Sequence, residues 1–329
     1  MPKLSVKENY MRTLRGDTPE YIPGPGDTVR MPRPPLFYGD RNGKTGIDFF
    51  GVEWSKEGSA LDAPIPRHDY FILDDIRKWR DVIKFPDISW IDWESMAKKD
   101  KEKFNPELPF GAGCAAGGMF QNFISFMGFT EGLIAVFEEP EEVRALAEAL
   151  CDYYLAMADD FLKYYEPDYI YFTDDIAAER SPFISLESFH EIFEPVWRRY
   201  ISYYKERGYL AAHHNCGCFE PFLDDLVDMG FNCWDPAQVC NDLVGIKKKF
   251  GNKLVINGGF PGNDFLPHLE ATEEQCRAAV KDTLDKLAPG GGFVFSGGAG
   301  GGPGVTNPVS QQRSQWIRDE FEKLRYSYY

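Results

Sequence analysis

From about residue 108 onward, short apolar runs alternate with longer segments in which apolar residues recur every three or four positions. The clearest periodic segment follows Pro140 and carries Val143, Leu146, Leu150 and Tyr154 on one helical face. Further helices are predicted over residues 186–207, 219–229, 242–250, 273–287 and 308–324. Strands are predicted over residues 110–114, 169–172, 209–212, 232–234, 254–257 and 293–296. Strands that alternate with helices of this length indicate a parallel sheet.

The first hundred residues are less regular. Ser5 and Glu8 predict a capping box at the start of a helix that ends at Gly16. An irregular, proline-rich N-terminal cover is expected next, because proline breaks regular elements; its prolines are Pro19, Pro23, Pro25, Pro32, Pro34 and Pro35. Residues 48–54 are predicted to form a strand or a hairpin.

Counting strands gives the fold class. Strands near residues 21, 50, 110, 170, 211, 233, 255 and 294 number about eight, which is the number that closes an α/β (β/α)8 TIM barrel. The alternative, an open doubly wound sheet, would need a G-x-G-x-x-G turn after its first strand, and the N-terminal part has none. We expect one domain over residues 1–329, with the cover and first barrel elements in 1–107 and regular βα units in 108–329.

Charge and cysteine content narrow the functional class. The chain has 36 Lys and Arg against 52 Asp and Glu, so its formal net charge is −16, which disfavours nucleic-acid binding. Its seven cysteines lack the density of a secreted disulfide framework, so we expect reduced thiols. No apolar run approaches the roughly 18–20 residues of a membrane span, so a cytoplasmic protein without a membrane partner is expected.

Polar side chains follow the predicted strands, where barrel enzymes carry their active sites. They are Asp174, Asp175, His214, Cys216, Asp235, Gln238, Asn257 and Ser296. His214 and Cys216 are separated by one residue, so in a strand both side chains point the same way and His213 points the other way. Imidazole and thiolate are preferred zinc ligands. The alternative is a buried histidine bonded to backbone beside an inert cysteine.

The carboxylates and aromatics allow several roles. Asp174 and Asp175 are candidates for a catalytic acid/base pair, for a metal ligand with its supporting neighbour, or for a helix N-cap. Asp235 is a catalytic candidate or a turn former before Pro236. Phe172 and Trp234 are candidates for stacking on a substrate or for the core, and Gln238, Asn257 and Ser296 are candidates for substrate binding.

Several motifs together resemble the uroporphyrinogen decarboxylase superfamily of (β/α)8 barrels, which includes cobalamin-dependent methyltransferases. They are residues 7–9, residues 14–16, residues 48–54, Asp174-Asp175, His214-x-Cys216-Gly217, residues 230–236 and residues 251–259. In the methyltransferase branch, His-x-Cys supplies two zinc ligands and a cysteine after the last strand supplies the third. This chain has Ser296-Gly297-Gly298 there, so the third ligand stays open, with Cys218 one candidate.

The resemblance also bears on the reaction. Related aryl-ether demethylating enzymes use glutamates and a histidine, and the spacing of Glu179, Glu194 and His214 is similar but misses by one residue. True decarboxylases carry the motif Arg-Gln-Ala-Gly-Arg, whereas this chain has only the separate Arg30, Arg33 and Arg41.

The resemblance therefore implies a corrinoid-dependent methyltransferase, the substrate-activating component of an O-demethylase system. Such an enzyme would move a methyl group from a methoxylated, aromatic substrate to the cob(I)alamin of a separate corrinoid protein. Two alternatives stay open. One is a decarboxylase or lyase that acts on a small carboxylated substrate without metal, and the other is a non-catalytic binding barrel.

Overall fold

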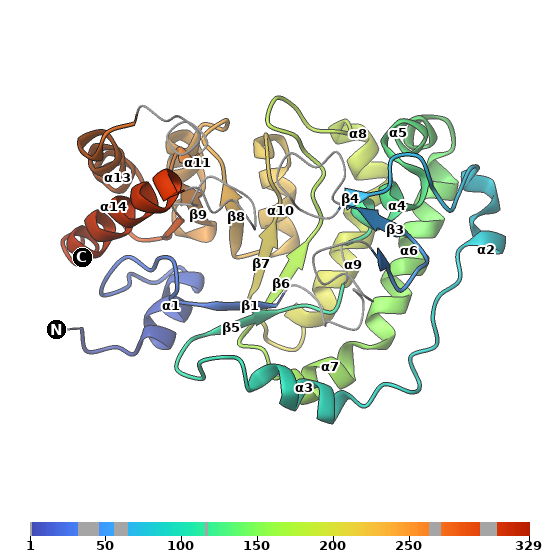
Figure 1. Cartoon of the computed structure of the whole chain (residues 1–329), viewed down its shortest axis with the longest axis horizontal. Coiled ribbons are helices and arrows are strands. Elements are labelled where there is room, and N and C mark those ends of the chain that lie inside the picture. The colour runs from blue at the N-terminus through green and yellow to red at the C-terminus, as the bar shows by residue number, and fades with distance from the viewer. Residues whose placement is uncertain (1, 32–45, 56–64, 116–117, 263–270, 297–307) are drawn as a thin grey trace.

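A curled parallel sheet forms the centre of the protein, with helices along its outer side (Figure 1). The computed structural model describes residues 2–31, 46–55, 65–115, 118–262, 271–296 and 308–329. Within these ranges the main sheet has seven parallel strands in the order β1-β5-β6-β7-β8-β9-β10. They are β1 (Val29–Met31), β5 (Phe110–Ala112), β6 (Tyr169–Thr173), β7 (Ala211–His214), β8 (Cys233–Ala237), β9 (Val255–Gly259) and β10 (Phe293–Ser296). The predicted α/β class and parallel sheet are confirmed.

Helices precede, connect and follow the strands of the main sheet along the chain. They are α1 (Val6–Leu14), α2 (Trp79–Val82), α3 (Trp93–Lys101), α4 (Phe120–Met127), α5 (Phe129–Glu138), α6 (Pro140–Ala156), α7 (Ala158–Tyr165), α8 (Leu186–Ser188), α9 (Glu194–Lys205), α10 (Leu223–Met229), α11 (Leu243–Phe250), α13 (Glu273–Leu287) and α14 (Pro308–Leu324). The bounds predicted for α13 and α14 are confirmed. The helix predicted over residues 186–207 is interrupted by a π-helical turn at Phe189–Phe193, and Pro195, which lacks a backbone N–H, lies in the first turn of α9.

Two of the eight strands predicted for the barrel, those near residues 21 and 50, are not strands of the main sheet at those positions. The first strand of the sheet is Val29–Met31 and not the segment near residue 21, although Pro23 O accepts a hydrogen bond from Phe295 N of β10 (2.9 Å). Residues 23–29 therefore link the two edges of the curled sheet. The strand expected near residue 50 is β3 (Glu53–Ser55), which pairs antiparallel with β2 (Gly46–Ile47) and β4 (Ile65–Pro66) in a separate small sheet.

A hairpin turn explains the small sheet. The carboxylate of Asp48 accepts hydrogen bonds from Phe50 N, Val52 N and Trp54 Nε1, and this folds the chain back on itself. A hairpin joins antiparallel strands, so it cannot supply the next strand of a parallel barrel. Of the predicted proline-rich cover, Pro32, Pro34 and Pro35 lie outside the described residues.

Alternating side chains divide the core into two clusters. Tyr169, Tyr171, Ala212, Cys233, Val255 and Val294 point to the concave side of the sheet, where they pack against Tyr10, Met11 and Leu14 of α1. Their neighbours along the same strands, such as Ile170 and Ile256, belong to the larger cluster beneath the surrounding helices. Helix α1 thus fills the end of the concave side at which the strands begin. Ser5 Oγ caps this helix by accepting Glu8 N (3.1 Å), whereas the Glu8 side chain pairs with Arg15.

This arrangement predicts that Leu14→Ala lowers the free energy of unfolding by about 2–5 kcal/mol, because it leaves a cavity under the strands. Urea denaturation would measure the change. Arg15→Ala, at the exposed end of the same helix, is the control and should change stability by less than about 0.5 kcal/mol. If Leu14→Ala and Arg15→Ala changed the free energy of unfolding by the same amount, the buried side of α1 would not support the sheet.

Candidate metal centre

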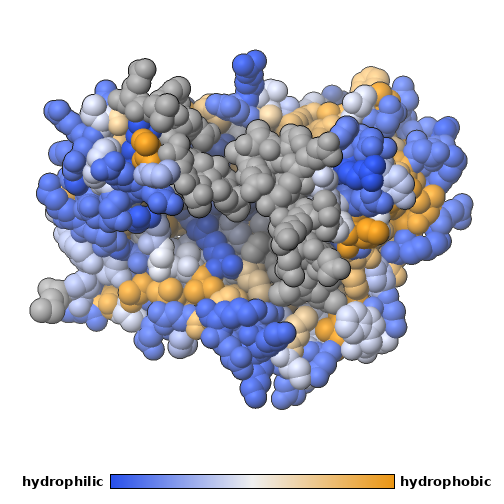
Figure 2. Space-filling model, viewed as in Figure 1, coloured by the Kyte–Doolittle hydropathy of each residue, from blue (hydrophilic) through white to orange (hydrophobic). Residues whose placement is uncertain are grey.

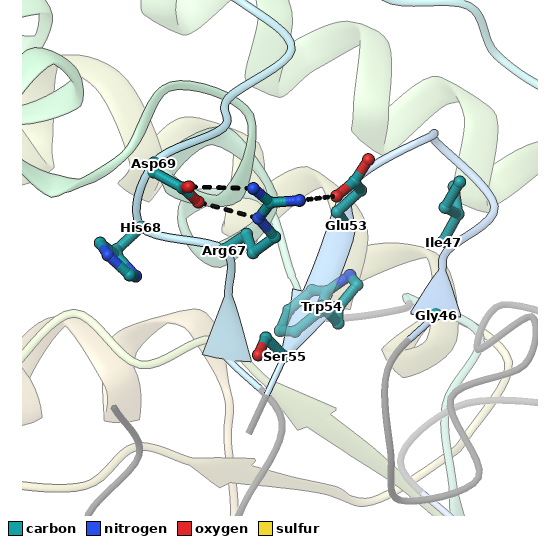
Figure 3. A pocket seen from close by; sticks show the side chains of 8 residues that line it. All are labelled: Gly46, Ile47, Glu53, Trp54, Ser55, Arg67, His68 and Asp69. Atoms are coloured by element: carbon teal, nitrogen blue, oxygen red, sulfur yellow. Dashed lines mark hydrogen bonds and ion pairs between the residues drawn. The ribbon is translucent and has the colours of Figure 1, made fainter. Parts of the chain in front are cut away.

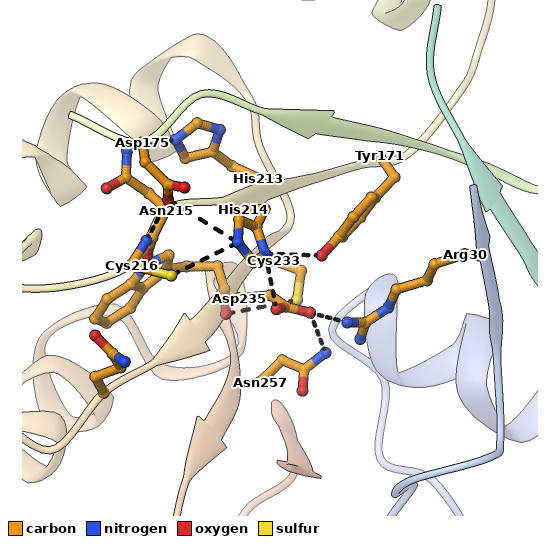
Figure 4. Close-up of polar contacts among 12 residues, drawn as sticks. Arg30, Tyr171, Asp175, His213, His214, Asn215, Cys216, Cys233, Asp235 and Asn257 are labelled. Carbon is orange, nitrogen blue, oxygen red and sulfur yellow. Dashed lines mark hydrogen bonds and ion pairs between the residues drawn. The ribbon is translucent and has the colours of Figure 1, made fainter. Parts of the chain in front are cut away.

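Three side chains of metal-binding type meet at the carboxyl ends of β6 and β7 (Figure 4). His214 Nε2 lies 3.7 Å from Cys216 Sγ and 3.9 Å from Asp175 Oδ1. One donor atom from each residue lies within 4.8 Å of the others, and all three side chains are half-buried. Across the described ranges, no other group of three or more His, Cys, Asp or Glu side chains meets this condition.

The local backbone explains why His214 and Cys216 share a side. His214 is the last residue of β7 and pairs in register with Thr173 of β6 and Asp235 of β8, so the pleat directs it inward. After Cys216 the chain turns at Gly217, where a side chain would meet Ala178 O at 2.4 Å. Gln238 Oε1 accepts the Gly217 N–H (2.5 Å) and holds this turn in place.

The two adjacent aspartates have different surroundings. Asp174 is fully buried, and its carboxylate accepts hydrogen bonds from Met119 N, Phe120 N, Gln121 N and Trp197 Nε1 at 2.8–3.0 Å. Burial raises the pKa of Asp174 to about 7, while these four donors act in the opposite direction. Asp174 therefore caps the first turn of helix α4 from a fully buried position, and its catalytic role stays a prediction.

Asp175 faces the donor group instead. Its Oδ1 accepts the Cys216 N–H (2.6 Å), and its Oδ2 accepts the Gln121 Nε2–H (2.9 Å). Helix α4 thus contacts both aspartates through the same first turn. Gly118 permits this close approach, since a side chain there would lie 2.2 Å from Asp174 Cγ.

Asp235 lies behind His214 and has only 5% of its surface exposed. Its Oδ1 lies 3.4 Å from His214 Nδ1, its Oδ2 accepts Asn257 Nδ2 (3.0 Å), and it forms an ion pair with Arg30. Burial raises the pKa of Asp235, but the positive charge of Arg30 and hydrogen bonds from His214 and Tyr171 outweigh burial, so the pKa lies below its ordinary value. Asp235 is therefore an anionic support for the histidine.

Sequence reasoning did not identify two members of this group as site residues. Tyr171 OH lies 3.0 Å from His214 Nδ1. Its position two residues before Thr173 puts it on the inward side of β6, and this spacing is the sequence signal that could have identified it as a site residue. Arg30 reaches Asp235 from β1, a three-residue strand far away in the sequence. No local pattern marks Arg30 as a partner of Asp235.

The predicted substrate-binding residues separate into two groups. Phe172 and Trp234 point outward and are 1% and 0% exposed, so the expectation that they stack on a substrate is corrected. Phe172 packs against Trp197 and the outward-pointing His213, whereas the indole N–H of Trp234 donates to Asn215 O (3.0 Å).

The other group lies at the site or beside it. Asn257 supports Asp235 and Gln238 supports Gly217. Ser296 ends β10 in register with Gly259 and is half-buried. The described residues place no hydrogen-bond partner near Asn257 Oδ1, although this atom is buried. Substrate binding by Asn257 and Ser296 stays a prediction.

The alternative ligands named from the sequence lie apart from this group. Cys218 is not among the three clustered donors; its backbone N–H donates to Ala178 O (2.8 Å). Glu194 accepts a hydrogen bond from Arg198 on its own helix (2.6 Å), and Glu179 is exposed.

Comparison with known proteins places the chain in a family. The family profile described as uroporphyrinogen decarboxylase (URO-D) matches residues 94–311, which is more than half of the 329 residues. The protein belongs to the URO-D family. No curated protein matches the sequence. Among solved structures, a methyltransferase from Methanosarcina mazei is similar in fold, with a TM-score of 0.68 and 14% identity over 98% of this chain and 99% of that one.

The donor group of this URO-D family member fits zinc. A tetrahedral zinc site separates its nitrogen, oxygen and sulfur ligands by ~3.3–3.6 Å, and the separations of 3.7 and 3.9 Å from His214 Nε2 need only small adjustments. A third protein ligand is offered by the Asp175 carboxylate. Three protein ligands leave the fourth position of a tetrahedral ion open, which is typical of catalytic zinc.

A separate pocket lies at the small antiparallel sheet. It has a volume of about 510 Å³ and is lined by residues that include Trp54, His68 and Arg67, which bridges Glu53 and Asp69 (Figure 3). None of the three metal donors lines it. The pocket therefore does not belong to the donor group.

One face of the exterior carries both kinds of side chain. Among the coloured residues of Figure 2, hydrophilic side chains are frequent and hydrophobic ones gather in patches between them. Among the described helices, none is long and apolar enough by itself to cross a membrane; the bent pair α4 and α5 passes that test only when joined.

The contrast between the two aspartates gives a prediction. Asp174→Asn should lower the free energy of unfolding by about 1–3 kcal/mol, because an amide has one acceptor oxygen for four N–H donors. Thermal or urea denaturation measures this loss. Asp175→Asn is the matched control: it should cost less stability and weaken zinc binding. If the two variants exchanged these effects, the assignment of cap and ligand would be reversed.

Proposed function

We propose that the protein is a methyltransferase that moves a methyl group from a methoxylated aromatic substrate to the cob(I)alamin of a separate corrinoid protein. The observation that supports this function best is the cluster of one nitrogen, one sulfur and one oxygen donor at the strand ends of a URO-D family fold. The similarity of fold to a methyltransferase from Methanosarcina mazei adds support.

The chemical difficulty lies in the leaving group. When a methyl group leaves an ether as a cation equivalent, the bonding electron pair stays on oxygen, and the resulting phenolate or alkoxide is a poor leaving group unless its charge is stabilised. Zinc, when bound by His214, Cys216 and Asp175, supplies a Lewis acid for that oxygen. The donor residues lie at the strand ends, where substrate and a methyl acceptor can meet in barrel enzymes.

The protein's own residues prepare the site in three ways. The turn at Gly217 and the Asp175 carboxylate fix the backbone of Cys216, Asp235 supports His214 from behind, and the first turn of α4 orients Asp175. Asn257 Oδ1 is buried and has no hydrogen-bond partner among the described residues, so we propose it as an acceptor for a substrate group. These contacts hold the donors in place before a substrate arrives, which is a condition for efficient catalysis.

The contacts of Arg30 count against the alternative of a decarboxylase. Such an enzyme needs cations that hold substrate carboxylates, and the charge of Arg30 is already balanced by Asp235. Arg33 and Arg41 lie outside the described residues.

Methyl transfer can be measured directly with free cob(I)alamin as acceptor and a panel of methoxyaromatic and aliphatic methyl donors. We expect the cob(I)alamin absorbance to give way to that of methylcobalamin with at least one methoxyaromatic. His214→Ala should reduce the rate at least 100-fold with little loss of stability. Release of CO2 from a carboxylated substrate, without methylcobalamin, would instead favour the decarboxylase.

Metal removal gives a second test. Purified protein should contain close to one zinc per chain, and treatment with a chelator should abolish methyl transfer until zinc is restored. Metal content is measured by plasma mass spectrometry before and after chelation. Less than about 0.2 zinc per chain, with activity unaffected by the chelator, would refute the metal site.

A further inference from the structure

We propose that Asp235 is a positioning residue that holds His214 in the tautomer protonated at Nδ1, so that Nε2 is presented to the metal, and that Arg30 and Asn257 fix Asp235 in turn. This inference rests on the metal site of the proposed function. It does not depend on which substrate the enzyme uses.

The two nitrogens of the His214 ring face different groups. Nε2 faces Cys216 Sγ (3.7 Å) and Asp175 Oδ1 (3.9 Å), whereas Nδ1 faces Tyr171 OH (3.0 Å) and Asp235 Oδ1 (3.4 Å). An ionised carboxylate can only accept hydrogen bonds, so the nitrogen beside it must carry the proton. A metal ligand needs a free lone pair, and the other nitrogen provides it.

Tyr171 is compatible with this choice. Its phenol oxygen lies 3.0 Å from His214 Nδ1 and can accept the Nδ1 proton. Figure 4 shows the imidazole with Tyr171 and Asp235 on the Nδ1 side and Cys216 and Asp175 on the other. The carboxylate of Asp235 therefore selects the tautomer, and the phenol accommodates it.

Asp235 is itself held by two donors. Asn257 Nδ2 donates to Oδ2 at 3.0 Å, and the guanidinium of Arg30 forms an ion pair with the same oxygen. Arg30 also lies over the ring of Tyr171, 5.1 Å from its centroid. Residues of β1, β6, β8 and β9 thus determine one orientation of the carboxylate, with Oδ2 toward the donors and Oδ1 toward the histidine.

These donors make the effect of one substitution predictable. In Asp235→Asn, Arg30 and Asn257 both require an acceptor, so the amide oxygen takes the place of Oδ2 and the amide NH2 turns toward His214 Nδ1. An N–H group facing Nδ1 favours the tautomer protonated at Nε2, whose metal-facing nitrogen has no free lone pair.

Zinc affinity tests the proposal without any methyl-transfer assay. Competition with a chromogenic chelator should show that Asp235→Asn binds zinc about 10–100-fold more weakly than the unaltered protein. Asp27→Asn is the matched control, because Asp27 also pairs with a buried arginine, Arg325, as part of a separate contact. Its zinc affinity should change by less than about twofold.

A spectroscopic measurement separates orientation from general damage. The chain has five histidines, so 15N-labelled imidazole signals can be assigned with a His214→Gln variant. In the zinc-loaded protein we expect His214 to be protonated at Nδ1, and in Asp235→Asn without metal we expect the Nε2-protonated tautomer. If Asp235→Asn does not fold, Asn257→Ala removes one support of the carboxylate and should weaken zinc binding several-fold.

The outcomes are distinguishable from those of the proposed function. Weaker zinc binding and an altered tautomer support the role of Asp235 even if no methyl donor is found. Unchanged zinc affinity in folded Asp235→Asn, or in Asn257→Ala where the first variant fails to fold, would overturn it. Absence of zinc binding by the unaltered protein would overturn the metal site of the proposed function and the role of Asp235 together, whereas loss of methyl transfer with intact zinc binding would leave the role of Asp235 standing.

Discussion

The site depends on one geometric constraint, the alternation of side chains along parallel strands. In β6, β7 and β8 this alternation sends Tyr171, His214 and Asp235 to the concave side of the sheet and their neighbours Phe172, His213 and Trp234 to the helices. His214 and Asp235 pair in register and lie at one level with Thr173. Tyr171 lies two residues earlier on β6, and its long side chain reaches His214 Nδ1 at 3.0 Å. The same constraint therefore separates the chemical residues from the packing residues.

Part of this organisation is predictable from sequence. Helical periodicity located α13 and α14, and the spacing of His214 and Cys216 placed both on one side. The roles of the two aspartates were not predictable, since Asp174 finds its donors on α4, more than fifty residues earlier in the chain. The same applies to Arg30, whose partner Asp235 is brought near only by the curl of the sheet.

Acidic residues in this protein have at least three separate uses. Asp174 stabilises a helix terminus, Asp175 offers an oxygen to the donor group, and Asp235 balances Arg30 and supports His214. Each use follows from the neighbours of the carboxylate and not from its position in the sequence, because Asp174 and Asp175 are adjacent. Local electrostatics, and not the total charge, therefore assigns the function of each residue.

We propose that His214, Cys216 and Asp175 together form one metal centre. Anomalous diffraction at the zinc absorption edge, from crystals of zinc-loaded protein, locates the bound ion. We expect one strong anomalous peak within bonding distance of His214 Nε2, Cys216 Sγ and an Asp175 oxygen. A fully loaded protein with no peak at these atoms, or with its zinc bound elsewhere, would show that the three residues do not form a metal centre.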